Sequence, residues 1–209
     1  MSEDVNFEVL SGHVSNIDRF QKAIGKIDSL NDEDPNRITH DNKEQGYELY
    51  FSKQLFNWVR SLDPQPSEEL LLAARSQHIR RWKIPRDSYP IDRAGYLKWR
   101  SDLKRFHART TREILTELGY DQTLLDRVES LNLKRGLKTD KDCQTLEDGL
   151  CLVFLEKQFA SFSQKTDREK MVGILRKTWA KMSEKGRQAA LGLDLGEEEL
   201  SLVKEALEG

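Results

Sequence analysis

The chain has 209 residues, of which 33% are charged and 37% hydrophobic, and its net charge is −2. This length suits one domain with a single core, and the near-neutral charge argues against a general nucleic-acid binder that acts through bulk charge. Cys143 and Cys151 form neither a disulfide framework nor a zinc-ribbon spacing, which favours a reducing compartment. No stretch approaches the ~20 apolar residues that cross a bilayer, and no basic leader opens the sequence. We therefore expect an intracellular protein of the cytoplasm or nucleus.

Helical spacing dominates the chain from its beginning. Five prolines and twelve glycines leave room for many helices, and no segment alternates β-branched with polar residues, so the sequence predicts an all-α fold. Residues 15–30 show helical periodicity with Ser15 as the N-cap, whereas the polar residues 31–46 read as a loop. Periodicity resumes over residues 48–62 and stops before a proline.

The stretch LLLAARSQHIRRW, residues 70–82, is the expected central helix, opened by Ser67 as its N-cap. Leu71, Ala74 and His78 fall at i, i+3 and i+7, which is one stripe of a helix. A histidine on that stripe points inward, where a neutral imidazole needs a hydrogen-bond partner or a metal ion.

Two prolines prevent residues 83–95 from forming one regular helix, so a Pro-containing loop is expected after the central helix. The remaining predicted helices cover residues 96–118, 122–133, 143–162, 170–185 and 197–207, and Gly186 is the expected stop of the fourth. The domain plan is a tail at 1–14 and a single helical domain at 15–209.

Four predicted helices each place one metal-competent side chain on an apolar face. These residues are Glu48, His78, His107 and Asp148. A buried carboxylate costs several kcal/mol unless it is paired or bound to a cation, so residues that converge share that cost. Two histidines with carboxylates suit manganese, iron, nickel or zinc. The alternative is that each is an ordinary hydrogen-bonded core residue, with Asp148 paired to an arginine such as Arg75.

The order of these features resembles the HD superfamily of helical metal-dependent phosphohydrolases. LLLAARSQHIRR is similar to its second motif, HARTTREILTELGYDQTLLDRVESL to the following segment and LEDGLCLVFLE to its last motif. The resemblance implies an HD-like core over about residues 47–160, C-terminal helices at 168–207 and a metal ion on His78, His107 and Asp148. The sequence departs from the motifs because Gln77 and Phe51 stand where the superfamily has histidines.

A second resemblance covers nearly the whole chain. The strings RFQKAIGKIDSLNDEDP, LAARSQHIRRWKIPRDSYPIDRAGYLKWR, QTLEDGLCLVFLE and KTWAKMSEKG resemble the family called domain of unknown function 4202. This resemblance implies a helical fold and brings no activity.

Basic residues gather around the two histidines. Residues 75–112 contain 12 Lys or Arg against 3 Asp or Glu. Positive charge beside a metal site suits a phosphate held by arginines, and we expect Arg81, Arg93 and Arg100 to clamp it. The alternative is a solvated helix face balanced by acids elsewhere.

The leading hypothesis is a metal-dependent hydrolase of a phosphate-containing small molecule or nucleotide. Glu48 and Glu147 are its candidate catalytic carboxylates, and the cation lowers the pKa of bound water. The alternative is a non-catalytic binding or regulatory protein on a degenerate HD-like scaffold; an iron-dependent oxygenase is a third possibility. The expected partner is an anionic small molecule, whereas nucleic acid and membranes are not expected.

Overall fold

The structure is a computed structural model that describes residues 10 and 12–208. The described chain is mostly helical with one small two-stranded sheet, which confirms the helical class predicted from the sequence. The helices are α2 (Ile17–Asp32), α3 (Tyr47–Leu62), α4 (Glu68–Ser76), α5 (Arg93–Glu117), α6 (Gln122–Asn132), α7 (Lys141–Val153), α8 (Phe159–Ser163), α9 (Arg168–Lys181), α10 (Glu184–Leu191) and α11 (Glu197–Glu208). The residues described include no helix long and apolar enough to cross a membrane.

Helix α2 begins one residue later than predicted, and its N-cap is Asn16 rather than Ser15. The Asn16 side chain accepts a hydrogen bond from the backbone N–H of Arg19. Ser15 instead donates through its backbone and hydroxyl to Glu68 at the start of α4, at 2.7 and 2.8 Å. Most of the predicted tail, residues 1–14, lies outside the described residues, although Leu10 is buried in the core.

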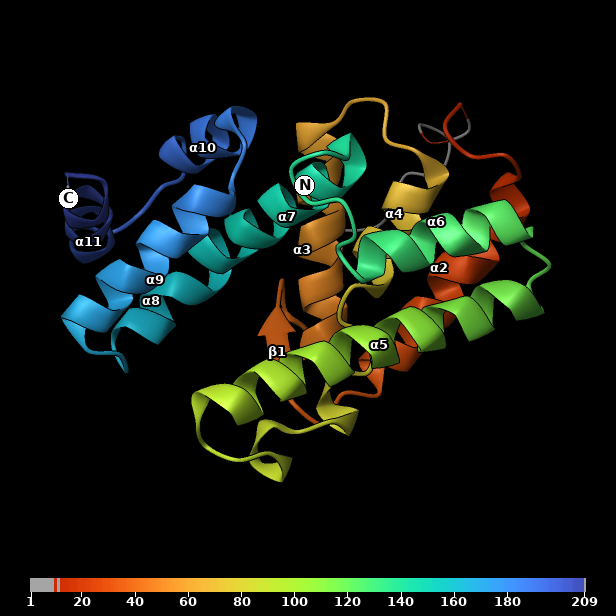
Figure 1. The fold of residues 1–209 in the computed structure, drawn as a ribbon. Helices are drawn as coiled ribbons and strands as arrows, with labels where there is room; N and C mark the ends of the chain where they lie inside the picture. Colours follow the sequence, from red (N-terminus) through yellow and green to blue (C-terminus); the bar gives the residue numbers. More distant parts are fainter. Residues whose placement is uncertain (1–9, 11, 209) are drawn as a thin grey trace.

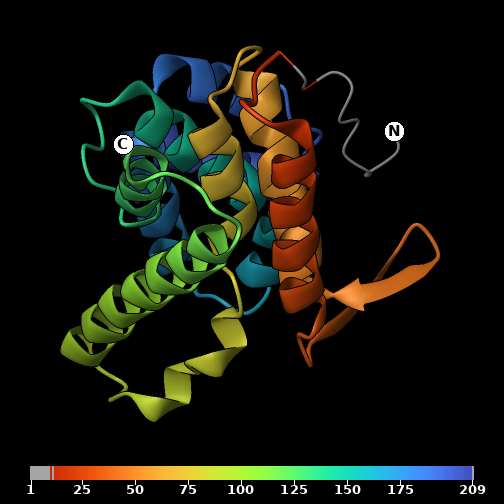
Figure 2. The ribbon, with the colours of Figure 1, turned by 90° about the vertical axis from the view of Figure 1, so that its right-hand side faces the viewer.

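The loop predicted over residues 31–46 is wrong in its second half, which forms an antiparallel hairpin. Strands β1 (Arg37–His40) and β2 (Lys43–Gly46) are joined by Asp41 and Asn42. Both joining residues have positive φ, 49° and 60°, as a two-residue type I′ hairpin turn requires. The strands are polar and lack hydrophobic alternation, so the Asp-Asn pair is their only sequence signal. The hairpin projects from the helices in Figure 2.

Most of the core of the described residues lies in two groups of buried side chains on either side of α7, and a small third group consists of Ile27, Ile79 and Ile114. The first group joins α2, α3, α4, α5, α6 and α7, and the second joins α7 to α8, α9, α10 and α11. Figure 1 shows the same arrangement, with α9, α10 and α11 on one side of α7 and α2, α4 and α6 on the other. Helix α7 thus contributes to both groups, as expected for the most apolar segment of the chain. Trp58 of α3 packs against both groups.

The central helix is shorter than predicted. Helix α4 begins after its predicted cap, Ser67, but ends at Ser76, so His78 lies in the following turn and not on a helical stripe. Two 3₁₀ turns, η1 (Arg81–Lys83) and η2 (Arg86–Ser88), follow it. They agree with the expected irregular, proline-containing segment.

The helices after α7 also depart from prediction. The apolar run expected to be one helix over residues 143–162 contains a π-helical segment, η3 (Phe154–Gln158), between α7 and α8. The helix expected over 170–185 ends at Lys181, and Ser183 caps a new helix, α10. Gly186 lies inside α10 instead of ending a helix.

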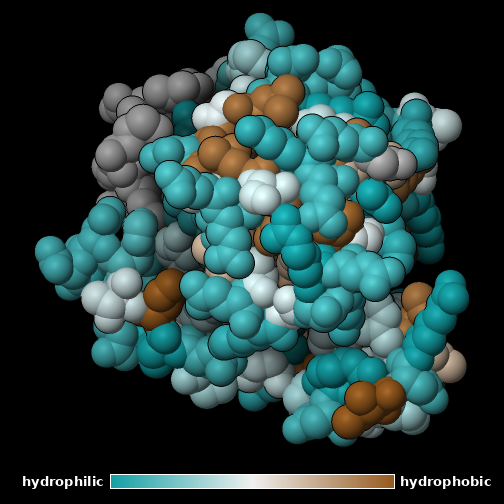
Figure 3. Space-filling view, turned by 90° about the vertical axis from the view of Figure 1, so that its left-hand side faces the viewer, coloured by the Kyte–Doolittle hydropathy of each residue, from teal (hydrophilic) through white to brown (hydrophobic). Residues whose placement is uncertain are grey.

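The large exposed apolar side chains of α8, α10 and α11 are Phe162, Leu191, Leu200 and Leu207, of which Leu191 and Leu207 line one small apolar hollow. Figure 3 shows the side of the molecule on which these helices lie as mostly hydrophilic with small, scattered hydrophobic areas. Single exposed apolar residues are normal for a folded surface.

Candidate functional site

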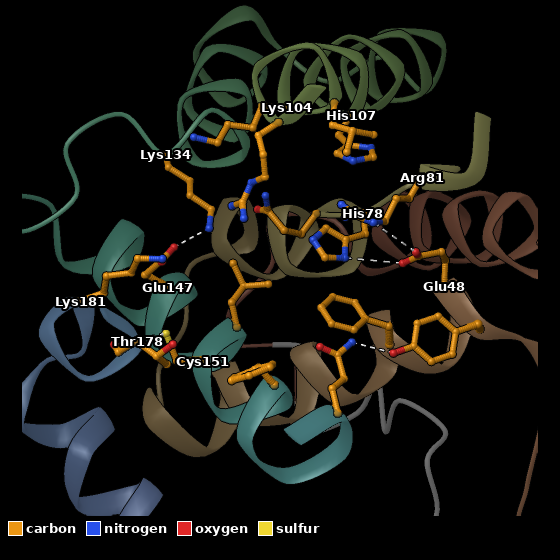
Figure 4. Close-up of a pocket in the computed structure, with 18 residues that line it drawn as sticks. Glu48, His78, Arg81, Lys104, His107, Lys134, Glu147, Cys151, Thr178 and Lys181 are labelled. Carbon is orange, nitrogen blue, oxygen red and sulfur yellow. Dashed lines mark hydrogen bonds and ion pairs between the residues drawn. The ribbon is translucent and has the colours of Figure 1, made fainter. Parts of the chain in front are cut away.

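A cavity of about 290 Å³ lies where α3, α5, α7, η3, α9 and the turn after α4 meet. Figure 4 shows side chains from these elements directed into one space. The lining residues are Tyr47, Glu48, Phe51, Gln77, His78, Arg81, Arg100, Leu103, Lys104, His107, Lys134, Glu147, Leu150, Cys151, Phe154, Gln158, Thr178 and Lys181. The structure thus brings together both predicted histidines, both predicted catalytic carboxylates and two of the three predicted arginines.

The turn after α4 places His78 and Arg81 at this cavity. Arg80 has a left-handed backbone, with φ of 51°, and its N–H donates to the side-chain oxygen of Asn31 at 3.1 Å. The carbonyl of Ile79 accepts a hydrogen bond from Nδ1 of His107 at 2.8 Å. Two distant segments therefore bind the backbone of the turn that follows α4, and local periodicity contains no signal of these contacts.

His107 presents an unprotonated nitrogen. Its Nδ1 must carry the hydrogen because a carbonyl only accepts, so Nε2 is left as an acceptor. Nε2 is buried and has no hydrogen-bond partner among the described residues. Burial lowers the pKa of His107 to about 3, only partly offset by the bond to Ile79, so the ring is neutral at pH 7. A buried acceptor without a partner is a place for a ligand donor.

Glu48 is the neutral acid of the cavity. Its backbone N–H donates to buried Asp34 at 3.1 Å, and its carboxyl lies 3.6 Å from Nδ1 of His78 and 3.9 Å from Nε of Arg81. Burial raises the pKa of Glu48 to about 8, with Asp34 adding to the rise and Arg81 opposing it. Burial likewise lowers the pKa of His78 well below its usual value, with Arg81 assisting. Both partners are therefore mainly uncharged at pH 7.

Glu147 has the opposite character. Burial would raise its pKa, but the ammonium of Lys134, in direct ion-pair contact, and that of Lys181 at 3.6 Å hold it below the usual value. Glu147 is therefore ionised at neutral pH. Two glutamates in one cavity have pKa values displaced in opposite directions, which separates a proton donor from a proton acceptor.

Positive charge dominates the lining. Five cationic side chains face the single ionised carboxylate of Glu147: Arg81, Arg100, Lys104, Lys134 and Lys181. Burial lowers the pKa of Lys104, and the neighbouring cations Lys134 and Arg100 lower it further. Neither Lys104 nor Arg100 forms an ion pair with another described residue. An excess of unpaired cations in a cavity attracts an anion.

Two predicted site residues, Asp148 and Arg93, do not line this cavity. Asp148 does not line the cavity with the histidines. It accepts hydrogen bonds from the backbone and hydroxyl of Ser183, the N-cap of α10, and from Gln144 in its own helix, α7. Arg93 is exposed in the first turn of α5 and does not line the cavity. Arg75, the alternative partner of Asp148, pairs with Asp28 at 2.6 Å.

The cavity brings together His78 and His107, two of the three predicted metal ligands, but not Asp148. The described residues contain no group of three or more His, Cys, Asp or Glu side chains arranged to hold a metal ion. The His78 ring stacks on Phe51 with ring centroids 4.3 Å apart, and its Nδ1 lies 3.6 Å from the Glu48 carboxyl, which also lies 3.9 Å from Arg81. The surrounding cations repel a further cation. Lys104 belongs to the basic stretch seen in the sequence, although it was not assigned to the phosphate clamp. Sequence reasoning missed Lys134 and Lys181, because they lie outside that stretch and only the fold brings them to the cavity.

Fold and cavity define a helical protein with a basic, partly buried site that contains one neutral and one ionised glutamate. A protein-family model described as a domain of unknown function (DUF4202) matches residues 21–203, and the chain belongs to this family. Comparisons with curated proteins and with solved structures gave no match.

Proposed function

We propose that the chain binds a phosphate-containing small molecule or nucleotide in this cavity and hydrolyses its phosphate ester. The observation that carries the proposal is the set of five cations around one ionised carboxylate. Two of them, Arg81 and Arg100, have planar guanidinium groups suited to two phosphate oxygens at once. The free acceptor Nε2 of His107 supports a ligand with hydroxyl or water donors.

The two glutamates supply the acid and the base of this proposed reaction. Water attacks phosphorus and the ester P–O bond breaks, so the leaving oxygen gains a proton and the water loses one. Glu48, protonated at pH 7, is the donor, and ionised Glu147 is the acceptor. The cations neutralise charge on the phosphoryl oxygens. The divalent metal (Mn, Fe, Ni or Zn) and the HD-like core predicted from the sequence stay predictions, and no step here uses them.

Replacing Lys104 with Met tests the anion site. Lys104→Met keeps an unbranched side chain that is one atom shorter and removes one cation that has no ion pair with the described residues. We expect roughly tenfold weaker binding of pyrophosphate or a nucleoside monophosphate by calorimetry. Lys170→Met, on the exposed face of α9, is the matched control and leaves affinity unchanged. Equal affinity in both variants, or no binding by the unmodified chain, contradicts the proposal.

A second candidate function is non-catalytic ligand binding. The observation that favours it is Phe51, which stacks on His78 where the HD superfamily has a histidine. A phosphate-release screen over phosphate esters separates the two: release above background that Glu48→Gln abolishes supports hydrolysis, whereas binding without release supports the second function. Elemental analysis of the purified protein decides the metal prediction in the same preparation.

A further inference from the structure

A second hollow, of about 860 Å³, runs beside the cavity between α5 and α6. We call it the basic groove. Three of its lining residues, Arg100, Lys104 and Lys181, also line the cavity, so the two spaces adjoin. Figure 1 shows α5 and α6 lying side by side along this part of the molecule. A ligand bound in the cavity can therefore extend into the basic groove along α5.

The basic groove has a strong excess of positive charge. Besides the three shared cations it is lined by Arg105, Arg109, Arg112 and Arg135. Its one acid, Glu129, is bound to Arg112 at 2.8 Å. Arg135 forms no ion pair with the described residues, and the carboxylates nearest Arg105 and Arg109 are 3.9 Å away. Several cations are thus left to meet a ligand.

The cations extend over more than one phosphate group. Arg100, Lys104 and Arg112 lie on one face of α5, and at 1.5 Å per residue the span from first to last is about 18 Å. A mononucleotide in the cavity would leave most of this row unused. A chain of regularly spaced anions would use it all.

Tyr96 and Leu97 close one end of the basic groove with exposed apolar surface, 42% and 56% exposed. The hydroxyl of Tyr96 accepts a hydrogen bond from Arg100 at 3.1 Å, which orients the ring beside the first cation of the row. An aromatic ring next to a track of cations is the usual platform for an unpaired base. This feature separates a nucleic acid from an inorganic polyanion.

We propose that the basic groove binds a single-stranded oligonucleotide whose terminal phosphate lies in the cavity. The inference rests on the proposed function and names its substrate class. A single strand fits because the terminal phosphate must enter a cavity of about 290 Å³. The net charge of −2 does not oppose this, because the cations are gathered along α5 while acids lie elsewhere.

The first test compares a 5′-phosphorylated, 3′-fluorescent octanucleotide with a nucleoside monophosphate. We expect the octanucleotide to bind at least tenfold more tightly at low salt, with an affinity that falls steeply with salt. Arg109→Glu combined with Arg135→Glu reverses two groove charges outside the cavity. We expect this variant to lose the octanucleotide advantage and to lower the salt slope by about 1.4, while the monophosphate affinity stays unchanged.

The matched control is Lys165→Glu combined with Lys170→Glu, two exposed cations remote from the groove, which should leave both affinities unchanged. If the octanucleotide binds no more tightly than the monophosphate, the inference is wrong and the proposed function stands. If neither ligand binds, both are wrong.

The second test asks whether a base is recognised. Tyr96→Ala removes the ring, and Tyr96→Phe retains it. We expect Tyr96→Ala to weaken octanucleotide binding at least fivefold and Tyr96→Phe to have little effect. Equal affinity in Tyr96→Ala and the unmodified chain, with inorganic polyphosphate displacing the octanucleotide at equal charge, overturns the oligonucleotide as the ligand.

Discussion

At the scale of single residues, burial decides the chemistry of the cavity. Glu48 and Glu147 carry the same carboxyl group, yet one faces Asp34 and a neutral histidine while the other faces two lysines. Close cations reduce the cost of ionising a buried acid, and the two lysines beside Glu147 reduce it more than the single arginine 3.9 Å from Glu48 does. The sequence indicated both residues, but the difference between them depends on Lys134 and Lys181, which come from distant parts of the chain.

The raised pKa of Glu48 makes stability depend on pH. A carboxyl whose pKa is higher in the folded state, about 8 against 4.5, binds more protons when folded between those values. Its stabilising contribution is therefore complete below about pH 4.5 and is lost as pH rises through 8. Gln stays neutral at every pH. We therefore expect the free energy of unfolding of Glu48→Gln, relative to that of the unmodified chain, to rise by roughly 2–4 kcal/mol from pH 5 to pH 9.

Urea denaturation at both pH values measures this difference. The matched control is Glu198→Gln on the exposed face of α11, for which the difference should not change with pH. A pH-independent difference for Glu48→Gln would show that its carboxyl is not held neutral by burial.

At the scale of elements, local signals predicted most of the helices, but they missed α10 and the hairpin and placed several helix ends wrongly. Ser67 was correctly predicted as a cap because it binds its own helix, and α3, α5 and α6 follow their periodicity. The end of α4 depends on Asn31 and His107, and the end of α9 on Asp148, which are remote in sequence. These errors affected the predicted site, because His78 was expected on a helix and Asp148 was expected close to it.

The junction of α7 and α10 gives a prediction at this scale. A Cβ atom on Gly186 would lie 2.6 Å from the carboxyl carbon of Asp148, so the two helices are packed too closely for any side chain. We expect Gly186→Ala to destabilise the fold by about 1–3 kcal/mol in urea denaturation. Gly173→Ala in α9, where nothing lies within 4 Å, is the control and should be neutral or slightly stabilising. Equal stability of the two variants would show that α10 is not packed against α7 in this way.

At the scale of the whole molecule, the cavity draws its lining from both sides of α7. Arg81 and Lys104 come from the segments around the first buried group, and Thr178 and Lys181 come from α9 in the second. An anion in the cavity therefore touches both parts and stabilises the folded chain by binding it in preference to the unfolded one. Composition predicted a basic neighbourhood, but only the tertiary fold selects which cations meet.

Sulfate provides the final test, because it remains a dianion throughout the relevant pH range. We expect sulfate to raise the melting temperature at pH 7 and to raise it less at pH 9, where ionised Glu48 adds a negative charge to the cavity. In Glu48→Gln, sulfate should raise the melting temperature equally at pH 7 and pH 9, since position 48 then carries no charge at either pH. A sulfate effect that is the same in both chains at pH 9 would mean that the anion binds away from Glu48, and the assignment of the cavity as the anion site would then be wrong.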